Sequence, residues 1–329
     1  MRRWLAMIGL LSLFGVITPA SGAWADPPTP GSSETLRTWD PDLGQLPEGI
    51  AVDKRGHIYV TMPFTGELRR IDPDGSEQVV ANLPTGGGFG PLGLAVDAPG
   101  NVYAGVATFD PATHGVWRVS RSGSTARLPG SEAIGFPNGV AFDDRGNLYA
   151  TDSIGGAVWR IPRGGSAEPW IQHELLAGDD SAPLPFPVGA NGITYRHRTV
   201  FVTNTELGSV VAVPVRPDGS AGSPSVAAQD PALGGADGIA LDVHGGMYVA
   251  VIVQSTIVHI PSGGGAVTTI ADGSDGLDFA SSIAFGTGDG ERKTLFAVNF
   301  SAGPFFGFPR THGPGLLAID AGVPGLPQP

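Results

Sequence analysis

The chain has 329 residues, no cysteine, and 31 acidic against 19 basic residues, which gives a net charge of −12 at pH 7. This balance disfavours nucleic acid and anionic membrane surfaces as partners, and the lack of cysteine excludes disulfides. An acidic surface suits cation binding, although it is also a common means of staying soluble.

The first 25 residues are predicted to be a signal peptide. Arg2 and Arg3 give a basic start, an apolar stretch runs from Leu5 to Ile17, and a small-x-small cleavage site ends at Ala25. Cleavage near Ala25 predicts a secreted or periplasmic protein, and no later apolar run is long enough to span a membrane. Residues 26–33 are expected to form a flexible leader, and residues 34–329 a single domain.

Six stretches of the mature chain share one pattern, in which a variable residue precedes a glycine and an aliphatic strand. Serine replaces the glycine in the last repeat. These residues lie 44, 46, 53, 46 and 44 positions apart, at Gly49, Gly93, Gly139, Gly192, Gly238 and Ser282. A period of this length is typical of solenoids and propellers.

Each repeat resolves into short strands separated by turns rich in Gly, Pro and Asp. In the first repeat we expect strands at 50–52, 58–61, 68–71 and 78–80, because β-branched and aromatic residues alternate there with polar ones. Later repeats copy the second and third of these strands, at 147–150 and 158–161, 200–202 and 210–213, and 247–249 and 257–260. Four strands in each of six repeats predict an all-β, six-bladed β-propeller.

The last repeat lacks an outer strand. After 295–298 it offers one further clear strand, 316–319, while residues 34–39 precede the first inner strand with no partner of their own. We therefore expect 34–39 to pair with the last blade and close the ring, which removes an exposed sheet edge.

The variable position before each glycine is the candidate site. Its six residues are Glu48, Leu92, Asn138, Asn191, Asp237 and Ser281. In a propeller they would form a ring at one mouth of the central channel. Two carboxylates and two amides are hard oxygen donors, so the ring predicts one divalent metal, most suitably Ca²⁺, with Mg²⁺, Mn²⁺ or Zn²⁺ also possible. The alternative is that Asn-Gly and Asp-Gly merely form turns.

At these residues the mature chain resembles the SMP-30/gluconolactonase/LRE-like (regucalcin-type) family of six-bladed propellers, and more distantly diisopropyl fluorophosphatase and the paraoxonases. Glu48 in Pro-Glu-Gly, Asn138 in Pro-Asn-Gly, Asn191 in Ala-Asn-Gly and Asp237 in Ala-Asp-Gly carry the resemblance. It implies Glu48, Asn191 and Asp237 as metal ligands, with Asn138 as a fourth ligand or a substrate contact. It also implies Asp237 as the catalytic base or nucleophile.

The connections between second and third strands are expected to open on the same face and to shape the pocket. We expect Phe64, Asp152 and Asn204 there to contact substrate. The 299–314 segment, with its four phenylalanines, either forms an apolar wall or lid or simply packs upon itself. His114 is expected to be an additional catalytic base, because the related paraoxonases use a histidine above their calcium.

The resulting hypothesis is an exported, divalent-metal-dependent hydrolase of lactones or related esters. The metal would polarise the substrate and activate water or Asp237. The alternative is a non-catalytic NHL-like propeller that binds a sugar, peptide or cell-wall ligand, with a structural metal. Since no Gly-x-Ser-x-Gly motif occurs, a serine hydrolase is not proposed. The expected partner is a small-molecule substrate, and the expected state is a monomer.

Overall fold

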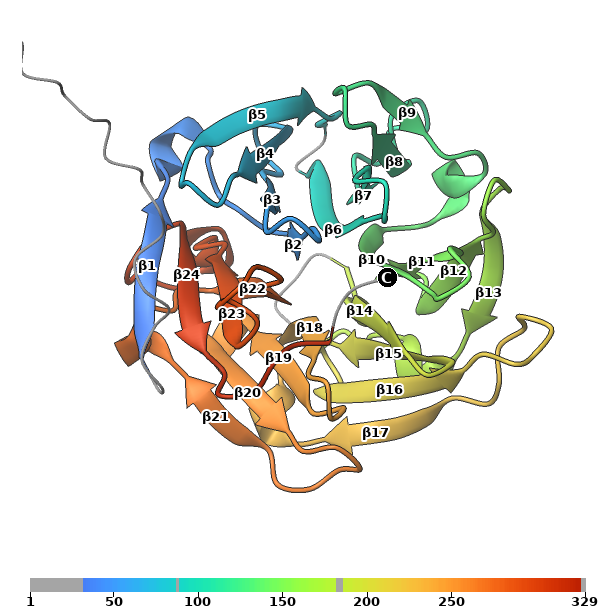
Figure 1. The fold of residues 1–329 in the computed structure, drawn as a ribbon. Coiled ribbons are helices and arrows are strands. Elements are labelled where there is room, and N and C mark those ends of the chain that lie inside the picture. The colour runs from blue at the N-terminus through green and yellow to red at the C-terminus, as the bar shows by residue number, and fades with distance from the viewer. Residues whose placement is uncertain (1–31, 87–88, 182–185, 327–329) are drawn as a thin grey trace, which may run out of the picture.

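Six four-stranded antiparallel sheets surround a central axis in the part of the chain that the computed structural model describes, residues 32–86, 89–181 and 186–326 (Figure 1). The predicted six-bladed all-β propeller is thereby confirmed. The predicted signal peptide lies outside the described residues, as does the leader apart from Ser32 and Ser33. Among the described residues, no helix is long and apolar enough to cross a membrane.

The first three blades follow one another along the chain, each from its inner to its outer strand. Blade 1 consists of β2 (Ile50–Val52), β3 (Ile58–Thr61), β4 (Glu67–Ile71) and β5 (Glu77–Asn82). Blade 2 consists of β6 (Pro91–Val96), β7 (Val102–Val106), β8 (Gly115–Val119) and β9 (Thr125–Arg127). Blade 3 consists of β10 (Pro137–Phe142), β11 (Leu148–Asp152), β12 (Ala157–Ile161) and β13 (Glu168–Gln172).

The last three blades repeat this order until the ring closes. Blade 4 consists of β14 (Ala190–Arg196), β15 (Thr199–Asn204), β16 (Ser209–Pro214) and β17 (Ser225–Gln229). Blade 5 consists of β18 (Ala236–Leu241), β19 (Met247–Val251), β20 (Thr256–Ile260) and β21 (Thr268–Ala271). Blade 6 consists of β22 (Ala280–Phe285), β23 (Thr294–Asn299), β24 (Gly315–Asp320) and β1 (Ser33–Thr38).

Short 3-10 turns occupy the connections on one face of the ring. In the described residues they are η1 (Pro41–Leu43), η2 (Ser131–Ala133), η3 (Glu174–Leu176), η4 (Pro231–Leu233), η5 (Ile252–Gln254), η6 (Gly273–Asp275) and η7 (Gly303–Phe306). Each lies before an inner strand or after a second strand. Because adjacent strands are antiparallel, those two kinds of connection meet on the same face.

The hydrophobic core lies between neighbouring blades. Ile58 and Val60 of blade 1, for example, pack in one buried cluster with Phe296 and Val298 of blade 6. Each blade buries both faces of its second strand in this way, as at β3, β11, β19 and β23, which explains why the second strands are mostly apolar. The packing fixes the angle between blades and therefore the position of the inner strands.

The N-terminal strand closes the ring as predicted. β1 pairs antiparallel with β24, with Glu34 opposite Ala318 and Thr38 opposite Gly315. The strand ends at Thr38, one residue earlier than expected, although the backbone N–H of Trp39 still donates to the Pro314 oxygen at 3.0 Å. The Trp39 side chain is buried, and its Nε1 donates to Glu77 Oε1 at 2.9 Å.

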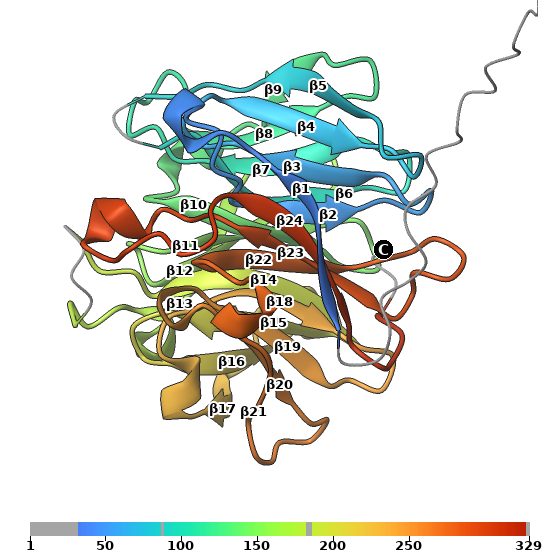
Figure 2. The ribbon, with the colours of Figure 1, turned by 90° about the vertical axis from the view of Figure 1, so that its left-hand side faces the viewer.

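The segment after β24 lies on the face of the ring opposite to the one that carries η7. Val243 donates its backbone N–H to Pro324 at 3.0 Å, and Leu326 donates to Leu241 at 2.8 Å. Figure 2 shows the separation, with the red helical turn η7 at one edge and the red chain that leaves β24 toward the other. The face that carries η7 is called the donor face below, because the four predicted oxygen donors lie there.

Candidate functional site

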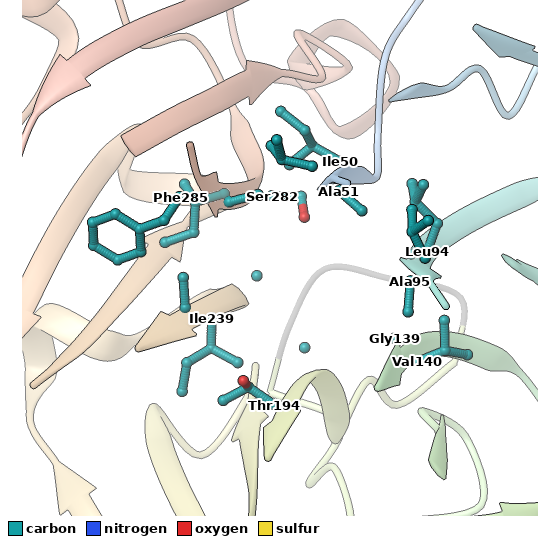
Figure 3. A pocket seen from close by; sticks show the side chains of 18 of the residues that line it. Ile50, Ala51, Leu94, Ala95, Gly139, Val140, Thr194, Ile239, Ser282 and Phe285 are labelled. Carbon is teal, nitrogen blue, oxygen red and sulfur yellow. The ribbon is translucent and has the colours of Figure 1, made fainter. Parts of the chain in front are cut away.

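A cavity of about 500 Å³ lies on the propeller axis and is lined by the inner strands of all six blades. Figure 3 looks into it, past small or aliphatic side chains such as Ala95, Val140 and Ile239. Glu48, Asn138, Asn191 and Asp237 all line it, each with only 6–7% of its surface exposed. The structure thus brings together four residues that span 189 positions of the sequence. They are called the donor ring.

Local backbone irregularity aims these side chains at the axis. The pairing of β10 with β11 shifts register between Pro137 and Val140, and β14 and β18 shift at the equivalent positions. A β-bulge of this kind adds a residue on one strand and redirects its side chain. Asn138, Asn191 and Asp237 each lie within such a bulge.

The glycine after each donor permits close contact between blades. A Cβ atom on Gly139 would lie 2.6 Å from the backbone oxygen of Asn191, and one on Gly192 would overlap the backbone oxygen of Asp237. Any side chain would therefore push the next blade outward. The repeated glycine reflects this close approach at the axis and needs no unusual φ angle at these positions.

Three threonines that the sequence analysis did not single out donate hydrogen bonds to the backbone oxygens of the variable residues. Thr151 donates from Oγ1 to the backbone oxygen of Asn191 at 2.6 Å, and Thr203 donates to that of Asp237 at the same distance. Thr61 donates to the oxygen of Leu92 at 2.7 Å. The signal was present in the sequence, because all three threonines occupy the same position in the second strand of their blades.

The two asparagines are oriented by neighbouring oxygen atoms. Asn138 Nδ2 donates to Asn191 Oδ1 at 2.7 Å and to Ser153 Oγ at 3.3 Å, while Asn191 Nδ2 donates to Thr205 Oγ1 at 3.0 Å. With both amide nitrogens engaged, the amide oxygens are the groups available to a cation, although Asn191 Oδ1 already accepts the Asn138 hydrogen bond and offers only its second lone pair.

Both carboxylates of the donor ring are buried. Glu48 Oε2 is buried with no hydrogen-bond partner among the described residues. At Asp237, the hydrogen bond from Thr203 goes to the backbone oxygen rather than to the carboxylate. Burial raises the pKa of Glu48 to about 8. Burial, and secondarily the Glu48 charge, raise the pKa of Asp237 well above its usual value. Two such carboxylates are costly to keep ionised without a counter-charge.

The donor ring fits a divalent cation. Two buried carboxylates and two oriented amide oxygens form the all-oxygen set that Ca²⁺ and similar hard cations prefer. The described residues contain no cluster of three or more His, Cys, Asp or Glu side chains that could hold a metal, so a site built mainly of acids or thiolates is not found there. Leu92 adds no donor, and Ser281 uses its Oγ to donate to the Glu48 backbone oxygen at 2.7 Å.

Asp152 and Asn204 lie on the donor face as expected but outside the cavity lining. The Asp152 carboxylate accepts from the backbone N–H groups of Gly135, Phe136 and Gly155 at 2.7–2.9 Å. Asn204 Nδ2 donates to two backbone oxygens of the 175–177 segment. Both residues hold the connections in place, and this geometry does not support their predicted contact with substrate.

His114 is buried on the donor face but is likewise separate from the cavity lining. Its Nδ1 accepts from the Phe109 backbone N–H at 3.1 Å, so Nε2 carries the proton and donates to the Ile134 oxygen at 2.7 Å. With both ring nitrogens engaged, the structure does not bring His114 together with the donor ring. Its predicted role as a base gains no support.

The four phenylalanines of the 299–314 segment pack against two different neighbours. Phe306 and Phe308 pack on Phe279 at centroid distances of 6.0 and 5.6 Å, which holds the segment against the connection before β22. Phe300 and Phe305 instead stack on Phe64 at 6.1 and 5.3 Å. None of these rings lines the cavity, so the predicted apolar wall or lid stays a prediction.

The buried Asp278 anchors this segment. One oxygen of its carboxylate accepts from Ser301 Oγ and from the backbone N–H groups of Thr311, His312 and Gly313 at 2.8–3.1 Å. Burial works against the charged form, but these hydrogen bonds outweigh it and hold the pKa of Asp278 below its usual value.

Comparison with known proteins supports the resemblance noted from the sequence. A family model described as "SMP-30/Gluconolactonase/LRE-like region" matches residues 188–298, the stretch that contains Asn191 and Asp237. A search of curated proteins found no match. The resemblance to that family is confirmed over this part of the chain.

Solved structures with the same fold are distant in sequence. A gluconolactonase from Xanthomonas campestris has a TM-score of 0.63 at 18% identity, with 88% of each chain covered. The calcium-binding protein regucalcin from Agrobacterium tumefaciens has a TM-score of 0.63 at 15% identity, covering 90% of this chain and 95% of that one. Virginiamycin B lyase from Staphylococcus aureus has a TM-score of 0.53 at 17% identity, covering 81% and 84%. At these identities the likeness establishes the fold alone.

Proposed function

We propose that this propeller, which carries an SMP-30/gluconolactonase/LRE-like region, is a divalent-metal-dependent hydrolase that opens lactones or related esters. The observation that carries the proposal is the buried, unpartnered Glu48 Oε2, which lies in one cavity lining with the buried Asp237 carboxylate and two oriented amide groups. Two buried carboxylates lower the stability of a fold, so their presence indicates that a bound cation or a reaction uses them. The export inferred from residues 1–25 remains part of this proposal.

In the donor ring, Glu48, Asn191 and Asp237 would hold the cation, with Asn138 as a fourth oxygen donor. A cation held there would neutralise the carboxylates and polarise a carbonyl oxygen of the substrate. Calcium is the cation we favour, because every donor is an oxygen atom.

Asp237 would then transfer the proton between water and the leaving group. The hydrogen bond from Thr203 goes to the backbone oxygen of Asp237 and not to its side chain. The Asp237 carboxylate, which lines the cavity, would therefore be free to accept a proton from water as the water oxygen bonds to the carbonyl carbon. The carbon–oxygen bond to the leaving alkoxide breaks, and the same proton passes to that alkoxide. The product of a lactone is the hydroxy acid, heavier by one water.

The test is metal titration combined with turnover. Calcium, manganese and zinc are titrated by calorimetry into chelator-treated protein, and a panel of lactones and aryl esters is followed by pH-stat and mass spectrometry. We expect one bound metal and products heavier by one water, with both lost in Asp237→Asn. Asp289→Asn, at the far end of the same cavity, is the matched control and retains both.

Two results would contradict the proposal. Products with no added water would indicate elimination, the class of reaction named for the lyase of similar fold. Absence of metal binding and turnover would leave the propeller as a non-catalytic binding module, the alternative raised from the sequence.

A further inference from the structure

Seven phenylalanine rings form a continuous contact series on the donor face. Neighbouring ring centroids lie 5.3–6.4 Å apart. The series, called the phenylalanine arc, consists of Phe64, Phe89, Phe109, Phe136, Phe186, Phe300 and Phe305. Its members come from blade connections that span most of the chain, so only the closed ring assembles it.

The arc reaches the ring of variable residues. Leu92, the apolar member of that ring, packs in one cluster with Phe136, and Phe89 and Phe186 lie against the same cluster. On the other side Leu46, two residues before Glu48, packs with Phe300 and Phe64. An apolar surface therefore begins beside the donor ring and extends outward over blades 6, 1, 2 and 3.

Loop packing does not account for the outer members of the arc. Phe305 is 64% exposed and Phe109 is 48% exposed, so neither gains the free energy of full burial. The connections of this face are instead held by polar groups such as Asp152, Asn204 and Asp278. The arc is not part of the cavity lining, but exposed apolar rings that lie this close to the donor ring are typical of an interaction site.

The polar groups near the arc are already engaged. Both ring nitrogens of His114 bond to backbone groups, and the Glu206 carboxylate accepts from the backbone of Asp179, Asp180 and Val188. A sugar lactone presents several hydroxyl groups, each of which loses its hydration unless the protein provides a partner. The phenyl rings of the arc cannot form those hydrogen bonds, so the arc favours an apolar group over a sugar.

Resting on the proposed function, we propose that the substrate is a lactone or ester with an alkyl or aryl group of several carbons, and that the phenylalanine arc binds that group. The ester carbon would lie at the donor ring and the apolar group along the arc. Apolar burial then selects among substrates, while the donor ring performs the same hydrolysis on each of them.

The experiment measures kcat/KM for γ-lactones whose side chain grows from hydrogen to heptyl, with gluconolactone as the polar comparison. Each methylene that the arc buries is expected to raise kcat/KM about three- to fourfold. Phe305→Ser and Phe109→Ser remove exposed rings and are therefore expected to fold, and each should reduce the ratio of heptyl to unsubstituted lactone. Val226→Ser, an equally exposed apolar residue on the outer strand β17, should leave that ratio unchanged.

A binding series separates this inference from the proposed function. Alkyl cyclopentanones of the same side-chain lengths cannot be hydrolysed, and their affinity is measured by calorimetry. Affinity that rises with chain length in the wild type but not in Phe305→Ser supports the arc even if no lactone is turned over. A flat affinity series, or gluconolactone preferred over every alkyl lactone, overturns the inference while leaving the hydrolase proposal intact.

Discussion

Thr203 donates its hydroxyl hydrogen bond to the backbone oxygen of Asp237 across the boundary between blades 4 and 5, at 2.6 Å. This bond ties the second strand of one blade to the candidate catalytic residue of the next. Both residues are buried, so neither partner can exchange the bond for one to bulk water. The position of Asp237 therefore depends on the neighbouring blade as much as on its own strand.

Replacing Thr203 with valine tests this dependence. Valine has the same shape but leaves the Asp237 oxygen without a partner, which should lower the free energy of unfolding by about 1–3 kcal/mol. Metal affinity should fall as well, since Asp237 is less firmly placed. Denaturant unfolding and calorimetric titration measure the two effects. Thr269→Val, at an exposed position of β21, is the control, and an equal loss there would refute the interpretation.

Adding one methyl group at Gly139 should disturb the ring. The Cβ of Gly139→Ala would lie 2.6 Å from the Asn191 backbone oxygen, so blades 3 and 4 must separate. We expect a loss of about 3 kcal/mol or more in the free energy of unfolding, together with weaker metal binding. Gly273→Ala has open space around its Cβ and is the matched control. Similar stability in the two variants would show that the close contact is not needed.

Glu48→Gln is expected to change the melting temperature and the metal affinity in opposite directions. At pH 9, above the pKa of about 8 that burial gives Glu48, the ionised carboxylate is buried without a partner. In chelator, the neutral glutamine is therefore expected to raise the melting temperature. It should also weaken metal binding. A variant that is less stable than the wild type in chelator would mean that Glu48 already has a stabilising partner.

Acid should release the 299–314 segment. Because the pKa of Asp278 is lower in the folded protein than its usual 3.8, the carboxylate contributes stability that is fully present above about pH 4. That contribution is lost as pH falls through the lower, folded value. The difference in melting temperature between wild type and Asp278→Asn should therefore shrink as pH falls from 6 to 3. A difference that is constant across this range would contradict the assignment.

The propeller and the ring of variable residues could be predicted because they repeat. Six copies of one pattern set the blade number, and the column before the glycine brought Glu48 and Asp237 to one cavity. The roles of Asp152, Asn204 and His114 could not be predicted, because each has a backbone partner 16 to 29 residues away with no recognisable sequence signal. A polar side chain on a functional face looks the same in sequence whether it meets a substrate or holds a loop.

The pairing of β1 with β24 has a consequence for how the chain folds. Residues some 280 positions apart must pair before the last sheet is complete, so forming that contact carries a high entropic cost of loop closure. Five blades can assemble from local hairpins, while β24 waits with an unpaired edge. Until Ser33–Thr38 arrives, that edge is a template for another chain, and the intermediate is prone to aggregate. Deleting these six residues should slow refolding to the complete propeller, while the local hairpins of the other blades still form.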